Sequence, residues 1–269
     1  MTQEALFYAG SNFIAAAGVK EVANWVTALN EYFPAVPWVQ FLHHWENVVF
    51  SLTAAGFLIL VGFLATRKKS LIPSGVQNAV EFAVESLDNL VVGIIGPKGR
   101  QHTPFVGTLF FFILLQNYMG IVPTMKSPTS NVNTTIALAA CVFFYVQAVS
   151  MKENGLIGYF DHLMGNPRDL IGWFMVPLLL PIHIMGELIR PVSLALRLFG
   201  NILGEDALIG TMVVLGLLVL SFVKSPVGLP LQFPFMLLSL LFGAIQALVF
   251  TVLSAIYISL VLPHEEHAH

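Results

Sequence analysis

Charged side chains are scarce in this chain of 269 residues. Asp, Glu, Lys and Arg together make up 10% of the sequence, whereas an ordinary soluble domain contains roughly 25%. Hydrophobic residues make up 57% and the mean hydropathy is +0.80, so the composition predicts a protein that crosses a membrane several times. The net charge of -3 supplies no basic surface that could follow a phosphate backbone, which argues against a nucleic-acid partner.

Cysteine is almost absent, since Cys141 is the only one. A single cysteine excludes an intramolecular disulfide and a cysteine-based metal cage, and its place inside an apolar run indicates a small buried hydrophobic residue. The His43-His44 pair and the histidines of the C-terminus lack a spaced set of carboxylates that would complete a metal site. We therefore expect no metal and no cofactor.

Long apolar runs dominate what remains. We expect about five membrane helices, because five runs are long enough to cross a hydrocarbon core of roughly 30 Å. These runs are residues 47–66, 104–123, 134–151, 169–222 and 232–262. The last two exceed an ordinary span, and Pro191, Gly200 and Gly204 leave open whether each is one long tilted helix or a broken one. The prediction is an all-α, polytopic membrane protein whose last two helices are long and tilted.

One further segment, residues 76–95, has an amphipathic pattern. Gln77, Glu81, Glu85 and Asp88 recur at helical spacing against apolar residues. A helix with such an acidic face is expected to lie on the membrane surface rather than to cross it.

The chain is predicted to have three parts. Residues 1–45 form an N-terminal external or interfacial segment, with aromatic residues such as Trp25 and Trp38 suited to the headgroup region. Residues 46–262 form the membrane channel domain, and residues 263–269 form a cytoplasmic tail.

Basic residues indicate the orientation in the membrane. If the chain begins outside, the cytoplasmic segments hold seven Lys and Arg residues and the outer segments hold three. The seven are Arg67, Lys68, Lys69, Lys98, Arg100, Lys152 and Arg168, and the three are Lys20, Lys126 and Lys224. This bias follows the positive-inside rule, so we expect the N-terminus outside and the C-terminus in the cytoplasm.

Ionisable residues interrupt the fourth apolar run at regular intervals. Steps of 4, 3, 7, 4 and 4 residues separate His183, Glu187, Arg190, Arg197, Asn201 and Glu205. On a helix this spacing keeps all six close to one face. An ionisable group at bilayer depth costs a few kcal/mol or more, and by default it marks an ion or substrate route.

The predicted orientation orders these residues across the membrane. His183 and Glu187 lie nearer the cytoplasm, Arg197 lies near the middle, and Glu205 and Asp206 lie toward the outside. On the returning segment, Gln246 is expected at about the depth of Arg197, and Ser239 is expected in the outer half.

The segment 190–201, with its core Leu-Arg-Leu-Phe-Gly-Asn, resembles the signature of subunit a, the stator channel subunit in the membrane sector of rotary F-type ATP synthases. Residues 128–135, Gln246-Ala247 and residues 256–260 resemble further landmarks of that family in their usual order. The resemblance covers roughly residues 75–262.

The resemblance implies roles for particular residues. Arg197 would be the essential cation that faces the rotor carboxylates, Asn201 and Gln246 its polar neighbours, and Asp206 the acid on the outer side. Ser239 departs from the pattern, because some members have a histidine there that pairs with this acid. Two other departures are His183, where an acidic residue is common, and Glu205, which adds a second acid.

Physical reasoning gives a mechanism for such a subunit. A permanently charged Arg197 would favour proton release from any carboxylate that approaches it, and it would repel an ion crossing directly. The outer half-channel would be lined by Glu205, Asp206 and Ser239, and the inner one by His183 and Glu187. Only rotation of a ring of carboxylates would then connect the two half-channels.

The implied partners are a rotor ring of small hairpin subunits, the peripheral stalk subunits, the lipid bilayer and, indirectly, a soluble ATPase head. The chain itself would hold no nucleotide site and would lie in a bacterial inner membrane. Protons are favoured over sodium only because they are the commoner case.

Several alternatives stay open. The chain could be a self-contained secondary transporter, although it lacks the related halves and paired broken helices of such folds. It could also be a structural anchor of a respiratory complex, which a buried Arg197 argues against. Arg190 is expected to be mainly structural. Spacing from Arg197 favours Glu205 as the outer relay, whereas the resemblance favours Asp206.

Overall fold

The computed structural model describes residues 24–34, 36–67, 75–122, 124–164, 170–221 and 230–262. Throughout these ranges the regular structure is helical, which confirms the all-α prediction. The elements are α2 (Trp25–Tyr32), α3 (Pro37–His44), α4 (Glu46–Arg67), α5 (Val76–Ile95), η1 (Pro97–Gln101), α6 (Thr103–Met119), η2 (Pro128–Ser130), α7 (Val132–Leu163), α8 (Leu170–Ser221) and α9 (Phe233–Val261). The predicted tail 263–269 and residues 1–23 lie outside the described ranges.

Four of the described helices contain a stretch long and apolar enough to cross a membrane. These stretches are Glu46–Arg67, Val132–Gly155, Phe174–Gly216 and Phe233–Val261. The fifth predicted span, α6, is apolar but has 17 residues, which gives a length of about 26 Å. The polytopic membrane fold is therefore confirmed, with α6 as its shortest apolar helix.

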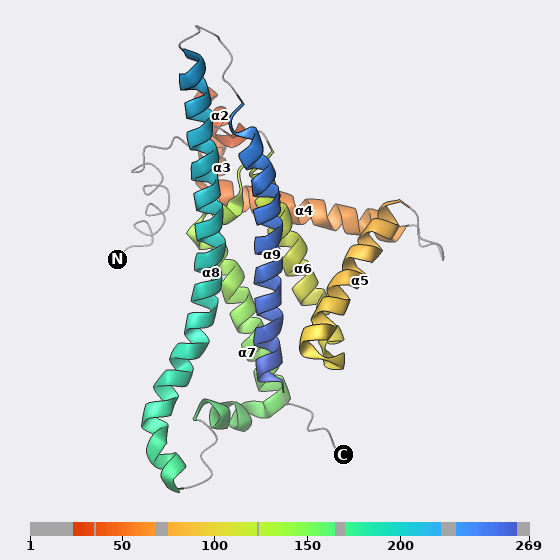
Figure 1. Cartoon of the computed structure of the whole chain (residues 1–269), viewed down its shortest axis with the longest axis vertical. Coiled ribbons are helices and arrows are strands. Elements are labelled where there is room, and N and C mark those ends of the chain that lie inside the picture. The colour runs from red at the N-terminus through yellow and green to blue at the C-terminus, as the bar shows by residue number, and fades with distance from the viewer. Residues whose placement is uncertain are drawn as a thin grey trace.

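The long helices do not run parallel to one another. α8 and α9 extend side by side along the long axis of the molecule, and α4 lies across them (Figure 1). The 22 residues of α4 span about 33 Å and so match the thickness of the hydrocarbon core. The 52 residues of α8 extend for about 78 Å and the 29 residues of α9 for about 44 Å, so both helices are longer than the hydrocarbon core of roughly 30 Å. The last two helices are therefore long, as predicted, and their tilt in the membrane stays a prediction.

Proline and glycine mark the irregular points. α8 continues through Pro177, Pro181 and Pro191, each of which removes one backbone hydrogen bond and favours a bend. α7 changes direction at Gly155, where φ is 70°, a left-handed conformation that favours glycine. The membrane-crossing part of α7 therefore ends at this residue.

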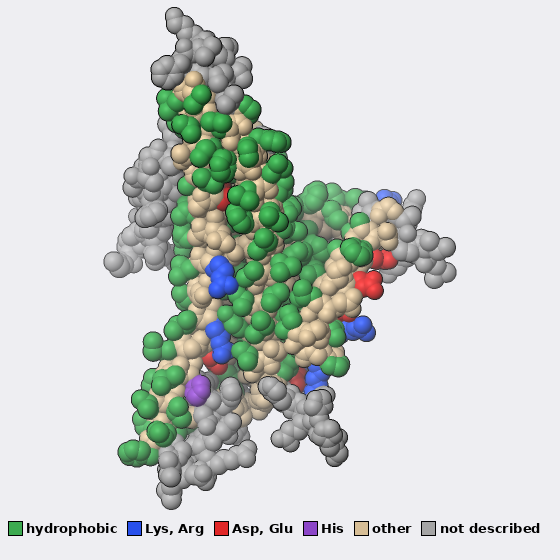
Figure 2. Space-filling view, viewed as in Figure 1, with side chains coloured by type: hydrophobic (Ala, Val, Ile, Leu, Met, Phe, Trp, Pro, Cys, Tyr) green, Lys and Arg blue, Asp and Glu red, His purple; other side chains and the backbone are tan. Residues whose placement is uncertain are grey.

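α5 has the bounds predicted for the amphipathic helix, residues 76–95. Its apolar side packs into the protein, where Leu87 and Val91 are buried. Glu81 and Glu85 are exposed on the other side. Charged side chains gather over this edge of the molecule, in contrast to the mostly apolar surface elsewhere in the same view (Figure 2).

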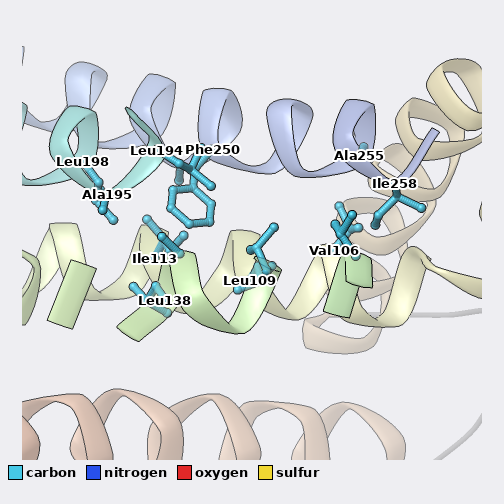
Figure 3. Close-up of a cluster of buried hydrophobic side chains, with 14 of the residues drawn as sticks. Val106, Leu109, Ile113, Leu138, Leu194, Ala195, Leu198, Phe250, Ala255 and Ile258 are labelled. Atoms are coloured by element: carbon cyan, nitrogen blue, oxygen red, sulfur yellow. The ribbon is translucent and has the colours of Figure 1, made fainter. Parts of the chain in front are cut away.

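A single large hydrophobic cluster joins α5, α6, α7, α8 and α9. Figure 3 shows its central part, where Ile113 of α6 and Phe250 of α9 face Leu194 and Leu198 of α8. All four of these side chains are essentially inaccessible to solvent. The cluster fixes one side of α8 against the bundle and leaves its opposite side uncovered.

Cys141 corrects one expectation from the sequence. It is exposed on α7 rather than buried. An apolar run in a membrane protein can face either protein or lipid, because both surroundings are apolar. The composition of the run therefore did not determine which side Cys141 faces.

Candidate functional site

The polar residues predicted along the fourth apolar run all lie on α8. Their surroundings differ along the helix. His183, Arg197 and Asn201 are exposed, whereas Glu187, Arg190, Glu205 and Asp206 are half-buried. One continuous helix thus bears seven polar side chains, and the same helix contributes Leu194 and Leu198 to the hydrophobic core.

Arg197 lies on the uncovered side of α8. Its immediate neighbour Leu198 is fully buried in the core, whereas Leu196 and Val192 are more than half exposed. In the described part of the chain, no hydrogen bond or ion pair reaches the Arg197 side chain. Figure 2 shows basic side chains on this helix set among hydrophobic ones. The result is a cation on an apolar surface without compensation from the described residues.

Asn201 lies one helical turn after Arg197 and connects α8 to α9. Its Nδ2 donates a hydrogen bond to Oε1 of Gln246 at 2.7 Å. Gln246 is only 3% exposed, and its Nε2 has no partner among the described residues. The structure therefore brings Asn201 and Gln246 together, one helical turn from Arg197.

Of the two residues expected in the inner half, His183 and Glu187, Glu187 lines a hollow between α7, α8 and α9. Glu187, Arg190 and Tyr257 are among its lining residues. The Glu187 Oε2 accepts a hydrogen bond from Gln147 Nε2 at 2.9 Å and a longer one from the Tyr159 hydroxyl at 3.5 Å. α7 thus holds the carboxylate of Glu187 from the side.

Arg190 has a structural contact of its own. Its guanidinium carbon lies 5.7 Å from the centroid of the Tyr257 ring, within the range of a cation–π interaction. No ion pair joins it to Glu187 in the described part of the chain. Arg190 therefore contacts α9, whereas Arg197 forms no hydrogen bond or ion pair among the described residues.

The three residues expected in the outer half, Glu205, Asp206 and Ser239, are not joined to one another by a hydrogen bond among the described residues. Glu205 and Asp206 are adjacent on α8 and both are half-buried. Ser239 of α9 is 1% exposed, and its hydroxyl has no hydrogen-bond partner among the described residues. The structure therefore does not join Ser239 to either acid directly.

Sequence reasoning did not identify a polar network where α6 meets α9. Asn117 Nδ2 donates to the backbone carbonyl of Gly243 at 3.0 Å, and its Oδ1 accepts from the Thr129 hydroxyl at 2.8 Å. The Ser127 hydroxyl bonds both Thr129, at 2.7 Å, and the carbonyl of Gln116, at 3.0 Å. A signal was present, because Gln116-Asn117 is a polar pair inside an apolar run.

Comparison with known proteins gives consistent matches over most of the chain. A family model described as ATP synthase A chain matches residues 48–259. A protein of Protochlamydia amoebophila, named ATP synthase subunit a, is 46% identical over 248 residues, which cover 92% of this chain and 91% of that protein. A protein of the same name from Solidesulfovibrio magneticus is 44% identical over 225 residues, 83% of this chain and 86% of that protein. The matched range of the family model includes Arg197 and the polar residues of α6, α7, α8 and α9 described in this section.

Proposed function

The chain belongs to the ATP synthase A chain family, and on that premise we propose that it conducts protons to and from the rotor ring of a rotary ATP synthase. It is a membrane-sector subunit of an F-type synthase and not the subunit that binds nucleotide. Its family places it in an assembly with other synthase subunits.

The observation that supports this proposal best is the exposed Arg197 without a polar partner among the described residues. An arginine stays protonated in proteins, because its pKa is above about 12. A charge of this kind in lipid is costly unless it is paired. A rotor subunit that carries a carboxylate supplies the missing anion, and attraction to Arg197 lowers the pKa of that carboxylate and favours release of its proton.

In this proposal the other polar residues of α8, with Ser239 of α9, line two separate water-filled half-channels. Glu187, which lines the hollow, and His183, one helical turn earlier on α8, line the inner half-channel. Glu205, Asp206 and Ser239 line the outer one. Because Arg197 repels a proton between them, a proton passes from one to the other only on a rotating carboxylate. Each charge that moves down 100 mV releases about 2.3 kcal/mol, and this free energy drives the ring.

The orientation and partners complete the proposal. Seven basic residues on one side against three on the other support an N-terminus outside and a C-terminus in the cytoplasm of a bacterial inner membrane. Residues 46–262 form the channel domain. The rotor ring of hairpin subunits meets the uncovered side of α8. Peripheral stalk subunits hold the chain in place while that ring rotates. The stalk also connects the chain to the soluble ATPase head, so the chain contacts this head only indirectly.

Cysteine cross-linking in the intact synthase tests the proposed contact. Ser193 lies one turn before Arg197 and is exposed, so a Ser193→Cys variant should cross-link to a cysteine placed beside the rotor carboxylate. The native Cys141 is exposed and is replaced by serine in all variants. The matched control is Thr53→Cys, which is exposed on α4 and should not cross-link.

Two results would contradict the proposal. One is an assembled synthase in which the Ser193→Cys variant does not cross-link to the rotor, or cross-links no more than the Thr53→Cys control. The other is an isolated chain that transports a substrate by itself in vesicles, as a secondary transporter does.

A further inference from the structure

Gln147 is the polar residue among those that α7 contributes to the hollow between α7, α8 and α9. The others from this helix are apolar, namely Val142, Phe143 and Val146. The Gln147 Nε2 donates a hydrogen bond to Oε2 of Glu187 at 2.9 Å. An otherwise apolar part of α7 thus presents one hydrogen-bond donor to an acid of α8.

Two parts of α7 hold the same oxygen of Glu187. Gln147 precedes the change of direction at Gly155, and Tyr159 follows it. The Tyr159 hydroxyl also donates to Oε2, at the longer distance of 3.5 Å. In the described part of the chain, no hydrogen bond reaches the other carboxylate oxygen, Oε1. A carboxylate oxygen accepts about two hydrogen bonds, so Oε2 is fully used and Oε1 is left open.

The orientation of the Gln147 amide follows from this contact. If the amide oxygen faced Glu187, two acceptor oxygens would meet, so the amide nitrogen is the atom that faces an ionised carboxylate. The amide oxygen is then buried and has no hydrogen-bond partner among the described residues. A buried acceptor without a partner is destabilising, so packing alone would favour an apolar residue here. The advantage of a glutamine lies in its contact with Glu187.

We propose that Gln147 is a positioning residue for proton exchange at Glu187, and that it holds Oε2 so that Oε1 takes up and releases the proton. A proton on its way from the rotor ring forms an O–H bond with Oε1 and neutralises the carboxylate. That bond breaks when the proton passes on to water, and Gln147 neither gains nor loses a proton. Hydrogen bonds from supporting residues lock the geometry of a reacting group in this way. The inference rests on the proposed function, in which Glu187 lines the inner half-channel.

A purely structural role for Gln147 makes a different prediction. A glutamine that only joins α7 to α8 affects assembly and thermal stability, and every complex that does assemble conducts protons normally. A positioning residue lowers the proton flux of the assembled complex, and it does so only while a carboxylate is within its reach. Mutations of two residues that act through one shared contact are not additive, so a double variant separates the two roles.

The experiment measures proton flux per assembled complex in vesicles that contain the intact synthase. Gln147→Met keeps an unbranched side chain that adapts to irregular space but removes the hydrogen bond, and we expect it to lower the flux several-fold. Glu187→Asp keeps a carboxyl group but withdraws it from the amide by one methylene, and we expect a similar loss. The double variant should lose no more flux than Glu187→Asp alone. Glu187→Gln removes proton exchange at this site and should lower the flux further.

Two controls test the packing of the hollow and the weaker hydrogen bond. Phe143→Met changes the wall of the same hollow, one turn before Gln147 on α7, and it should keep the wild-type flux. Tyr159→Phe removes only the longer hydrogen bond to Glu187, so it should lower the flux less than Gln147→Met does.

Wild-type flux in Gln147→Met or in Glu187→Gln would overturn the inference. So would a double variant in which Gln147→Met causes the same further loss as it causes alone, because its effect would then not depend on Glu187. An equal loss in Phe143→Met would assign the effect to packing and would also overturn the inference. Failure of the proposed function is recognised separately, by coupled synthesis that persists in Arg197→Ala. If Arg197 is essential while Gln147→Met conducts normally, only the role of Gln147 is wrong.

Discussion

Glu46 at the start of α4 and Arg197 in the middle of α8 are both charged residues on long apolar helices, but their surroundings differ. Glu46 is 7% exposed. It accepts a hydrogen bond from the Asn24 side chain and lies 3.4 Å from the ring of His43 and 3.7 Å from the ammonium of Lys126. Arg197 is exposed, and none of the described residues pairs with it.

The difference separates two uses of charge. The groups around Glu46 come from three parts of the chain, so they hold the N-terminal helices and the loop after α6 together. The charge of Glu46 thus has its hydrogen-bond and ion-pair partners within the chain itself. Around Arg197 the described chain supplies apolar neighbours and no counter-charge, which is the arrangement expected of a cation that acts on another subunit. Changing Arg197 should therefore affect function without affecting stability, and changing Glu46 should do the reverse.

The largest effect is expected from Arg197→Ala. It should abolish proton-driven ATP synthesis and leave assembly and thermal unfolding of the complex unchanged, because no hydrogen bond or ion pair among the described residues is lost. Arg197→Lys should also fail, or nearly so, since a compact ammonium can lose its proton and lacks the planar guanidinium. ATP synthesis by reconstituted complexes measures both. Arg190→Ala is the control, and because its guanidinium faces Tyr257 it should mainly lower stability.

The next largest effect is expected at the two outer acids. Glu205→Gln or Asp206→Asn alone should slow proton uptake without stopping it. The remaining acid, half-buried on the adjacent residue, can still take up protons. The double variant should nearly stop proton uptake while assembly survives. Proton flux into vesicles distinguishes these outcomes. Unimpaired flux in the double variant would remove both acids from the pathway and leave Arg197 as the only supported part of it.

Glu46→Gln should have the opposite character. The substitution keeps the shape but removes the charge that faces Lys126 and His43, and hydrogen bonds to charged groups contribute about 1.5–3 kcal/mol. We expect a lower unfolding temperature of the complex and an unchanged proton flux per complex that remains assembled. A Glu46→Gln synthase of normal stability and reduced flux would reverse the assignment of the two regions.

The smallest effect concerns His102, which precedes α6. Its Nδ1 lies 2.9 Å from the Tyr145 hydroxyl, and burial lowers the pKa of its imidazole, with nearby Glu153 opposing and Lys152 assisting the shift. Because the pKa in the folded state is below the unfolded value of about 6.5, the stabilisation is present above that pH and is lost as the pH falls below it. Thermal unfolding between neutral and mildly acidic pH should show this loss.

The matching control for His102 is His102→Gln, which keeps a polar partner for Tyr145 but does not titrate near neutral pH. Its unfolding temperature should depend less on pH than that of the wild type. Equal pH dependence in the two proteins would show that other groups cause the loss.

Local patterns in the sequence were sufficient for much of this structure. Membrane helices follow from the length of apolar runs, so α4 was predicted to within one residue at each end. The bounds of α5 followed from its amphipathic repeat. The spacing of Arg197 and Asn201 fixed their common face of α8, because helical periodicity depends only on neighbouring residues.

Contacts between distant segments could not be predicted in this way. Glu187 meets Gln147, which lies forty residues earlier, and Asn117 meets Gly243, which lies 126 residues later. Such pairs depend on which helices pack together and at what depth, and an apolar run carries little information about either. The exposure of Cys141 was missed for the same reason.

The hydrogen-bonded contact between Asn117 and Gly243 also has a mechanical consequence. In the proposed assembly, the rotating ring exerts a sideways force on α8 and α9. If these helices were displaced by that force, part of the work of rotation would deform the subunit. Because Gly243 has no side chain, α9 sits close against α6, and Asn117 ties that contact to the loop that holds Thr129. The same loop carries Lys126, which faces Glu46. The load therefore has a continuous path from α9 to the start of α4, away from the surface on which the ring would slide.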